Sequence, residues 1–159
     1  MKRFLSRYGL TLVFQILLVM LLVQIANEIT GGALRIFGIY PREPTSLIFI
    51  FTAPFVHGNW LHFANNAIGF LIFSSICLVR GKRFYWQSSL LIITAGGFLV
   101  WLFGRPAIHI GASGWIFGLW SLTIALAWFE KSVTNFLIAF GVILLYGGMI
   151  AGVLPSQPG

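Results

Sequence analysis

Long apolar stretches separated by short polar ones dominate the chain. A helix needs about 20 apolar residues, at about 1.5 Å rise per residue, to cross the hydrocarbon core of a bilayer. Five stretches come close to that length, and we therefore expect five transmembrane helices. Their ranges are 10–26, 60–79, 84–103, 113–129 and 133–153. The pattern predicts an all-α polytopic membrane protein in which residues 1–159 form a single domain.

The connection between the first two predicted helices, about residues 27–59, has a different composition. It contains Pro41, Pro44 and Pro54, together with a short apolar segment at 46–55. About ten apolar residues are too few to cross a bilayer. We therefore expect this connection to be an embedded loop that lies in the interface or re-enters the membrane.

The composition supports a membrane protein and excludes a soluble domain. Hydrophobic residues make up 58% of the chain and charged residues 8%, whereas a soluble domain carries about 25% charged residues. The lipid bilayer is therefore one expected partner. The single cysteine, Cys77, lies in an apolar stretch and is expected to be a small packing residue.

The net charge of +7 follows the membrane topology and needs no nucleic-acid partner. Seven basic residues fall on one side of the predicted helices: Lys2, Arg3, Arg7, Arg80, Lys82, Arg83 and Lys131. Arg35, Arg42 and Arg105 fall on the other side. The positive-inside rule then places the N-terminus in the cytoplasm. No small-x-small site follows the first apolar core at the right distance, which argues against a cleaved signal peptide. The short basic N-terminus favours a multi-pass protein of a bacterial inner membrane.

Polar residues that are rare in membrane helices gather at one predicted depth. His62 and Asn66 are four residues apart and share a helix face in the outer half of the second helix. Ser113 lies at the outer end of the fourth helix, between Gly111 and Gly114. A nucleophilic serine needs small neighbours, and imidazole and carboxamide groups can stabilise an oxyanion. Each group also has a structural interpretation, as interhelical hydrogen bonds or close helix packing.

A metal site is the other chemical interpretation of the histidines. The candidates are His57, His62 and His109, but a five-residue spacing turns the first two apart on a helix. Glu28, Glu43 and Glu130 lie in loops or at the opposite face. The pattern does not favour a metal ion, and no cofactor is implied.

Two segments together resemble the rhomboid family of intramembrane serine proteases. They are Phe55-Val-His-Gly-Asn-Trp-Leu-His-Phe-Ala-Asn-Asn66 and His109-Ile-Gly-Ala-Ser-Gly-Trp-Ile-Phe-Gly-Leu119. The resemblance covers about residues 45–155 and implies a rhomboid-like helical bundle with five of the usual six transmembrane helices present. It implies an endopeptidase that cleaves transmembrane helices of membrane proteins near the outer leaflet.

The resemblance also implies roles for individual residues. Ser113 matches the nucleophile, and His62 and Asn66 match the side chains that stabilise the oxyanion. His57 matches a histidine at the start of a helix that helps to hold the site and its water. Gly111 and Gly114 match the glycines that open space around the nucleophile.

One part of the family's site is absent from the sequence, because no histidine follows Ser113. The family's base is a histidine on a sixth helix, so we expect the chain to be truncated before that helix. Lys131 cannot replace it, since 18 residues of helix separate it from Ser113 by about 27 Å. His109 is expected to point toward the outer rim.

Two alternatives to a protease remain open. One is a catalytically inactive rhomboid-like protein that binds membrane helices. The other is a transporter or channel component, which would need charged residues along a path through the helices. The predicted helix interiors offer almost none.

Overall fold

The computed structural model describes residues 7–130. The predicted helix at 133–153, Lys131 and the C-terminal segment lie outside the described residues. The chain divides into two compact units, Met1–Leu119 and Trp120–Gly159. All candidate site residues belong to the first unit.

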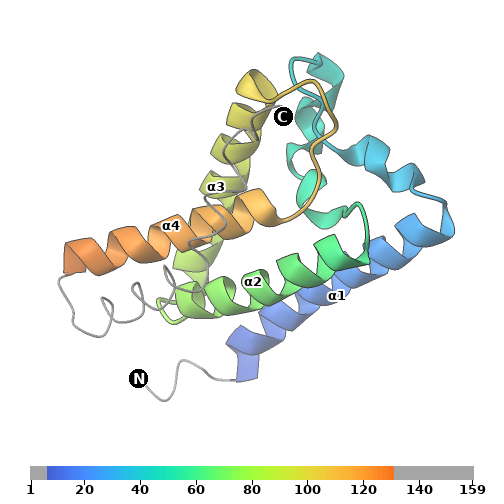
Figure 1. The fold of residues 1–159 in the computed structure, drawn as a ribbon. Coiled ribbons are helices and arrows are strands. Elements are labelled where there is room, and N and C mark those ends of the chain that lie inside the picture. The colour runs from blue at the N-terminus through green and yellow to red at the C-terminus, as the bar shows by residue number, and fades with distance from the viewer. Residues whose placement is uncertain (1–6, 131–159) are drawn as a thin grey trace, which may run out of the picture. The chain divides into compact units, whose positions relative to one another are not determined.

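The regular secondary structure of the described residues is helical apart from a single bridge between Ile39 and His109 (Figure 1). The α-helices are α1 (Arg7–Ile29), α2 (Trp60–Leu78), α3 (Lys82–Phe103) and α4 (Ser113–Glu130). Helices α1, α2 and α3 are long and apolar enough to cross a membrane, and the shorter helix Ser113–Phe129 is also apolar. The prediction of an all-α membrane protein is thereby confirmed for the described residues.

Helix α1 packs along α2 through one stripe of buried side chains (Figure 1). Val13, Ile16, Met20, Gln24 and Asn27 are all buried, at the three- and four-residue spacing of one helix face. Both polar atoms of the Gln24 amide lack a hydrogen-bond partner among the described residues. The helix ends where Gly31 and Gly32 adopt left-handed conformations, with the Gly32 amide bonded to the Asn27 carbonyl (2.7 Å).

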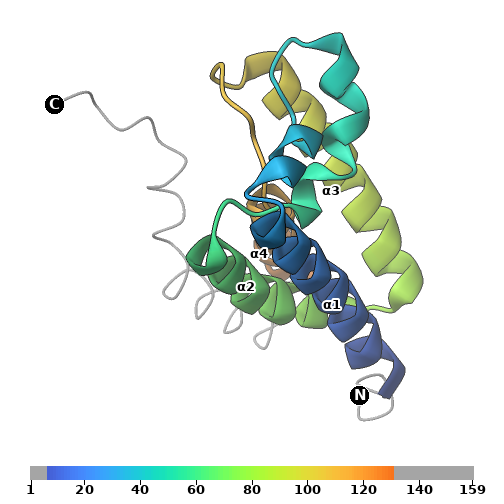
Figure 2. The same ribbon diagram turned by 90° about the vertical axis from the view of Figure 1, so that its right-hand side faces the viewer.

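The connection between α1 and α2 folds into three 3-10 helices. They are η1 (Ala33–Phe37), η2 (Pro44–Ile50) and η3 (Ala53–Phe55). Ile39, Ile50 and Ala53 form a small buried core, against which Ile93, Val100 and Trp101 of α3 pack. A methyl group at Gly97 of α3 would lie 2.5 Å from Ile50. Figure 2 shows the connection beside the C-terminal end of α3.

Helix α2 buries a face that begins with Asn66 and continues through Phe70, Phe73 and Cys77. Cys77 is 1% exposed, so the predicted packing role fits its position. Asn59 caps the helix, because its side-chain oxygen accepts the His62 amide (2.8 Å). His57 lies two residues before this cap, in the loop that leads into α2.

Candidate active site

The site is built where the first turn of α2 meets the segment that leads into α4. His62 lies in the first turn of α2, and its Nδ1 accepts the Gly58 amide through a long hydrogen bond (3.5 Å). A neutral imidazole that accepts at Nδ1 carries its proton on Nε2. The Nε2–H of His62 is therefore a donor available to a ligand.

Gly111 is where His62 and Asn66 converge. A methyl group at Gly111 would lie 2.6 Å from Nε2 of His62 and 3.8 Å from the Asn66 amide nitrogen. The φ angle of Gly111 is +107°, a conformation that residues with a side chain rarely adopt. Glycine is required here for two reasons, which are the backbone conformation and the space that the imidazole occupies.

Asn66 is 5% exposed, and its side chain has a defined orientation. The amide nitrogen donates to the His62 carbonyl one turn earlier (2.8 Å). An amide nitrogen carries two protons, so one remains for a ligand near Gly111. His62 and Asn66 thus place two donors on one side of the segment that ends at Ser113.

Ser113 is the first residue of α4, and its side chain is exposed in the described part of the chain. The first amides of a helix have no acceptor within the helix. The two preceding amides are occupied, since Gly111 donates to the Ala53 carbonyl (2.9 Å) and Ala112 to Nε2 of His57 (3.5 Å). The Ser113 amide has no acceptor among the described residues, and the helix dipole favours negative charge beside it.

Buried contacts fix the first turns of α4. The Trp115 indole donates to Ser89 of α3 (3.0 Å), and its ring lies 4.7 Å from the Phe70 ring. A methyl group at Gly69 would lie 3.1 Å from Ile116. By contrast, a methyl group at Gly114 would meet no described atom within 4 Å, so the space beside Ser113 is open among the described residues.

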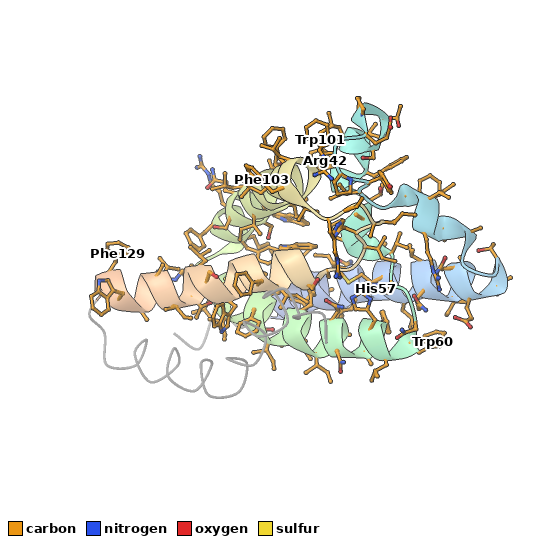
Figure 3. All side chains as sticks on the ribbon, turned by 45° about the horizontal axis from the view of Figure 1, so that its top comes forward. Arg42, His57, Trp60, Trp101, Phe103 and Phe129 are labelled. Atoms are coloured by element: carbon orange, nitrogen blue, oxygen red, sulfur yellow. The ribbon has the colours of Figure 1, made fainter. Side chains whose placement is uncertain are left out.

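His57 is fully buried and lies where α1, α2 and the beginning of α4 come together (Figure 3). Its backbone carbonyl accepts the side-chain amide of Asn27 from α1 (3.0 Å). The ring lies 5.2 Å from the His62 ring. The prediction that these two histidines are turned apart on a helix is wrong, because His57 lies in the loop before α2.

The two close histidine rings do not amount to a metal site in the described residues. His109, the third candidate ligand, places its Nε2 3.1 Å from the Arg105 carbonyl. Residues 7–130 contain no group of three His, Cys, Asp or Glu side chains with the geometry to hold a metal ion. The contact between His109 and the Arg105 carbonyl also argues against His109 as an alternative base for Ser113.

The pKa of His57 is lowered to about 4, mainly because burial disfavours the charged imidazole; the neighbouring His62 acts in the same direction, and a hydrogen bond with the Phe55 backbone partly offsets both effects. The unfolded value is about 6.5, so the unfolded chain binds more protons between about pH 4 and 6.5. Stability is therefore expected to fall as the pH drops through that window, by up to about 1.4 kcal/mol per pH unit.

A His57→Gln variant tests this prediction, because glutamine is neutral and retains an acceptor for the Ala112 amide. Thermal unfolding in detergent at pH 5 and pH 7 is the measurement. The wild type should lose more stability than the variant between the two pH values. Equal losses would show that His57 titrates normally in the folded protein.

Three residues that support this site were not predicted from the sequence: Asn59, Asn27 and Arg35. Asn59 was recognisable, since an asparagine directly before a helical stretch is a common N-cap. Asn27 bonds to His57 across 30 residues of chain. Arg35 donates to the Gly58 carbonyl (2.7 Å). The last two contacts depend on the path of the connection, which no local pattern indicates.

Comparison with known proteins identifies the family. The Rhomboid domain matches residues 44–158, which is most of the chain. The chain belongs to the rhomboid family, whose members are generally serine intramembrane proteases that act on membrane proteins within the bilayer.

Relatives come from bacteria and a plant. The uncharacterized protein Rv1337 of Mycobacterium tuberculosis is 30% identical over 154 residues, covering 92% of this chain and 64% of that protein. Rhomboid-like protein 11, chloroplastic, of Arabidopsis thaliana is 28% identical over 133 residues, covering 79% of this chain and 46% of that protein. The chain thus spans less than two thirds of the length of these curated relatives. No solved structure matches it.

Proposed function

We propose that this protein is an intramembrane serine endopeptidase that cleaves transmembrane helices of membrane proteins near the outer leaflet. Ser113 attacks the scissile carbonyl, and His62, Asn66 and the Ser113 amide stabilise the oxyanion. The observation that carries the proposal is the convergence of His62 and Asn66 on Gly111, two residues before an exposed serine at a helix N-terminus.

The donors fit the charge that develops in acyl transfer. A tetrahedral intermediate carries negative charge on one oxygen, and fixed donors in a water-poor site stabilise it strongly. The two side chains are already held by Gly58 and by the His62 carbonyl, so little reorganisation is needed. Glycine at 111 and the open space at Gly114 leave room for a substrate carbonyl.

The base of the reaction is a separate part of the proposal. The three histidines of the sequence all precede Ser113. Nε2 of His57 accepts the Ala112 amide (3.5 Å), and Nε2 of His109 lies 3.1 Å from the Arg105 carbonyl. The curated relatives are longer than this chain. We propose that a histidine outside these 159 residues removes the proton from Ser113, as the resemblance to the family implies.

The protein is proposed to work in a bacterial inner membrane with its N-terminus in the cytoplasm. The distribution of basic residues supports this orientation. In that topology the first turn of α2 and the start of α4 lie toward the outer leaflet.

Loss of the oxyanion donors tests the proposal. We expect His62→Ala and Asn66→Ala each to lower kcat by about 10²- to 10³-fold with a smaller change in KM, because the donors act mainly in the transition state. The assay is cleavage of a transmembrane substrate by the full-length protein in liposomes. Asn59→Ser, which preserves a helix cap, is the control and should retain most activity. An unchanged kcat in both alanine variants would exclude the proposed donor roles.

The second candidate function is an inactive rhomboid-like protein that binds membrane helices. The observation that favours it is that, among the described residues, Nε2 of His57 and Nε2 of His109 contact backbone groups and not the Ser113 hydroxyl. It predicts binding of transmembrane helices by the full-length protein without cleavage, and no effect of changes at Ser113.

A further inference from the structure

The segment that leads into Ser113 is held by the connection between α1 and α2. Residues 104–112 join α3 to α4 without helical structure of their own. His109 pairs with Ile39 through two backbone hydrogen bonds (2.9 and 2.8 Å). Gly111 donates to the Ala53 carbonyl (2.9 Å). The position of Ser113 therefore depends on where the connection lies.

Close packing leaves this pairing little freedom. A methyl group at Gly38 would lie 2.5 Å from both Ile108 and Ile110 and 2.9 Å from the His109 carbonyl. Gly38 thus allows the two backbones to approach, and the flanking isoleucines cover the contact. The pairing cannot shift by one residue without a collision with these side chains.

Arg42 fastens the same connection to the end of α3. Its amide donates to the Trp101 carbonyl (2.9 Å). Its guanidinium donates to the carbonyls of Leu102 (3.3 Å) and Gly104 (2.9 Å). These carbonyls lie at the C-terminus of the helix, where they have no hydrogen-bond donor within the helix and where a positive charge is favoured. Figure 3 shows Arg42 beside Trp101 at this end of α3.

A further hydrogen bond joins the connection to α3, and here the donor belongs to α3. The Trp101 indole donates to the Glu43 carbonyl (2.9 Å). Ser46, which is buried, bonds both to the Tyr40 amide (3.1 Å) and to the Tyr40 carbonyl (2.7 Å). The turn around Arg42 is therefore hydrogen-bonded to the last turn of α3 and to the residue that follows it, through three backbone carbonyls and one indole.

The backbone of Arg42 is itself unusual. Its φ angle is +63°, and no other residue except glycine has a positive φ in the described chain. Such a conformation is unfavourable for a residue with a side chain and persists only where surrounding contacts impose it. An arginine at this position indicates that its guanidinium contacts matter more than the backbone preference.

We propose that Arg42 is a positioning residue for Ser113. By fixing the connection to the end of α3, it holds both ends of residues 104–112, so that Gly111 remains against His62 and Asn66. The proposal rests on the proposed function for its catalytic consequence, but the loss of order in residues 104–112 is expected whether or not the protein is a protease.

Arg42→Gln tests the proposal, and Arg105→Gln is the matched control. Both changes remove one positive charge from the same outer region, but the Arg105 side chain has no hydrogen bond among the described residues. Amide hydrogen exchange of peptides covering 104–112 is the first measurement, in the full-length protein. We expect exchange at His109 and Gly111 to be at least 10-fold faster in Arg42→Gln than in Arg105→Gln. Equal exchange overturns the proposal.

The second measurement is cleavage by the same proteins in liposomes. Misplacing a reacting group by about 1 Å can cost on the order of 100-fold in rate. We expect kcat of Arg42→Gln to fall by about 10- to 100-fold, with KM within about threefold of the control. Faster exchange with an unchanged kcat overturns the positioning role, and absent cleavage in the wild type instead counts against the proposed function.

A further variant covers the case in which Arg42→Gln does not fold. Arg42→Gly tolerates the positive φ and removes only the side-chain contacts. It should show the same faster exchange at residues 104–112 while retaining the turn. If Arg42→Gly exchanges like the wild type, the guanidinium does not hold the segment.

Discussion

Replacing Ser113 by alanine is expected to abolish cleavage of a transmembrane substrate by the full-length protein. Loss of the nucleophile of a serine hydrolase lowers kcat on the order of 10⁶-fold, which is below detection in a liposome assay. Ser113 is exposed and forms no hydrogen bond among the described residues, so the variant should keep the stability of the wild type within about 0.5 kcal/mol.

Ser75→Ala is the matched control for this prediction. The Ser75 hydroxyl donates to the Leu71 carbonyl of its own helix (2.6 Å), and within residues 7–130 this is its one hydrogen bond. Ser75 lies far along α2 from the site. Its activity should stay near that of the wild type. Cleavage by Ser113→Ala at more than a trace level would assign the nucleophile to another residue.

Replacing Gly111 by alanine is expected to have the next largest effect. The added methyl group would lie 2.6 Å from Nε2 and 2.7 Å from Cε1 of His62, so either the imidazole or the segment before Ser113 must move. Loss of one oxyanion donor alone costs about 10²- to 10³-fold. Because displacement of the segment also moves Ser113, we expect kcat to fall by at least about 10³-fold.

Gly81→Ala is the control that separates the steric collision with His62 from the strain of a positive φ angle. Gly81 has a similar φ of +103°, and a methyl group there would meet no described atom within 4 Å. It precedes α3, away from the site. This variant should lose stability by on the order of 1–3 kcal/mol while its kcat changes little. If both variants lose the same activity, the contact between Gly111 and His62 is not the cause.

The helices of the first unit were largely predictable because their residues obey local rules. Apolar length fixed the expected positions of α1, α2 and α3, and the four-residue spacing placed His62 and Asn66 on one face. Gly111 and Gly114 also indicated that another group can approach Ser113 closely. Each of these features can be recognised within about twenty residues of sequence.

The path of the connection was not predictable in the same way. Arg42 contacts Gly104 across 62 residues of chain, and Asn27 contacts His57 across 30. From the sequence, Arg35 and Arg42 were recognised only as basic residues on the outer side of the predicted helices. In the structure each donates to backbone carbonyls, at Gly58 for Arg35 and at the end of α3 for Arg42. Such contacts depend on tertiary packing, which hydrophobic periodicity does not encode.

The most direct test of the central claim is a search for a covalent adduct at Ser113. The full-length protein, in native membranes, is treated with a fluorophosphonate probe, and the modified peptide is identified by mass spectrometry. An activated serine beside His62 and Asn66 should give a single adduct on Ser113, which is lost in Ser113→Ala and reduced in Gly111→Ala. A protein that remains unmodified, or one whose adduct persists in Ser113→Ala, would contradict Ser113 as the nucleophile.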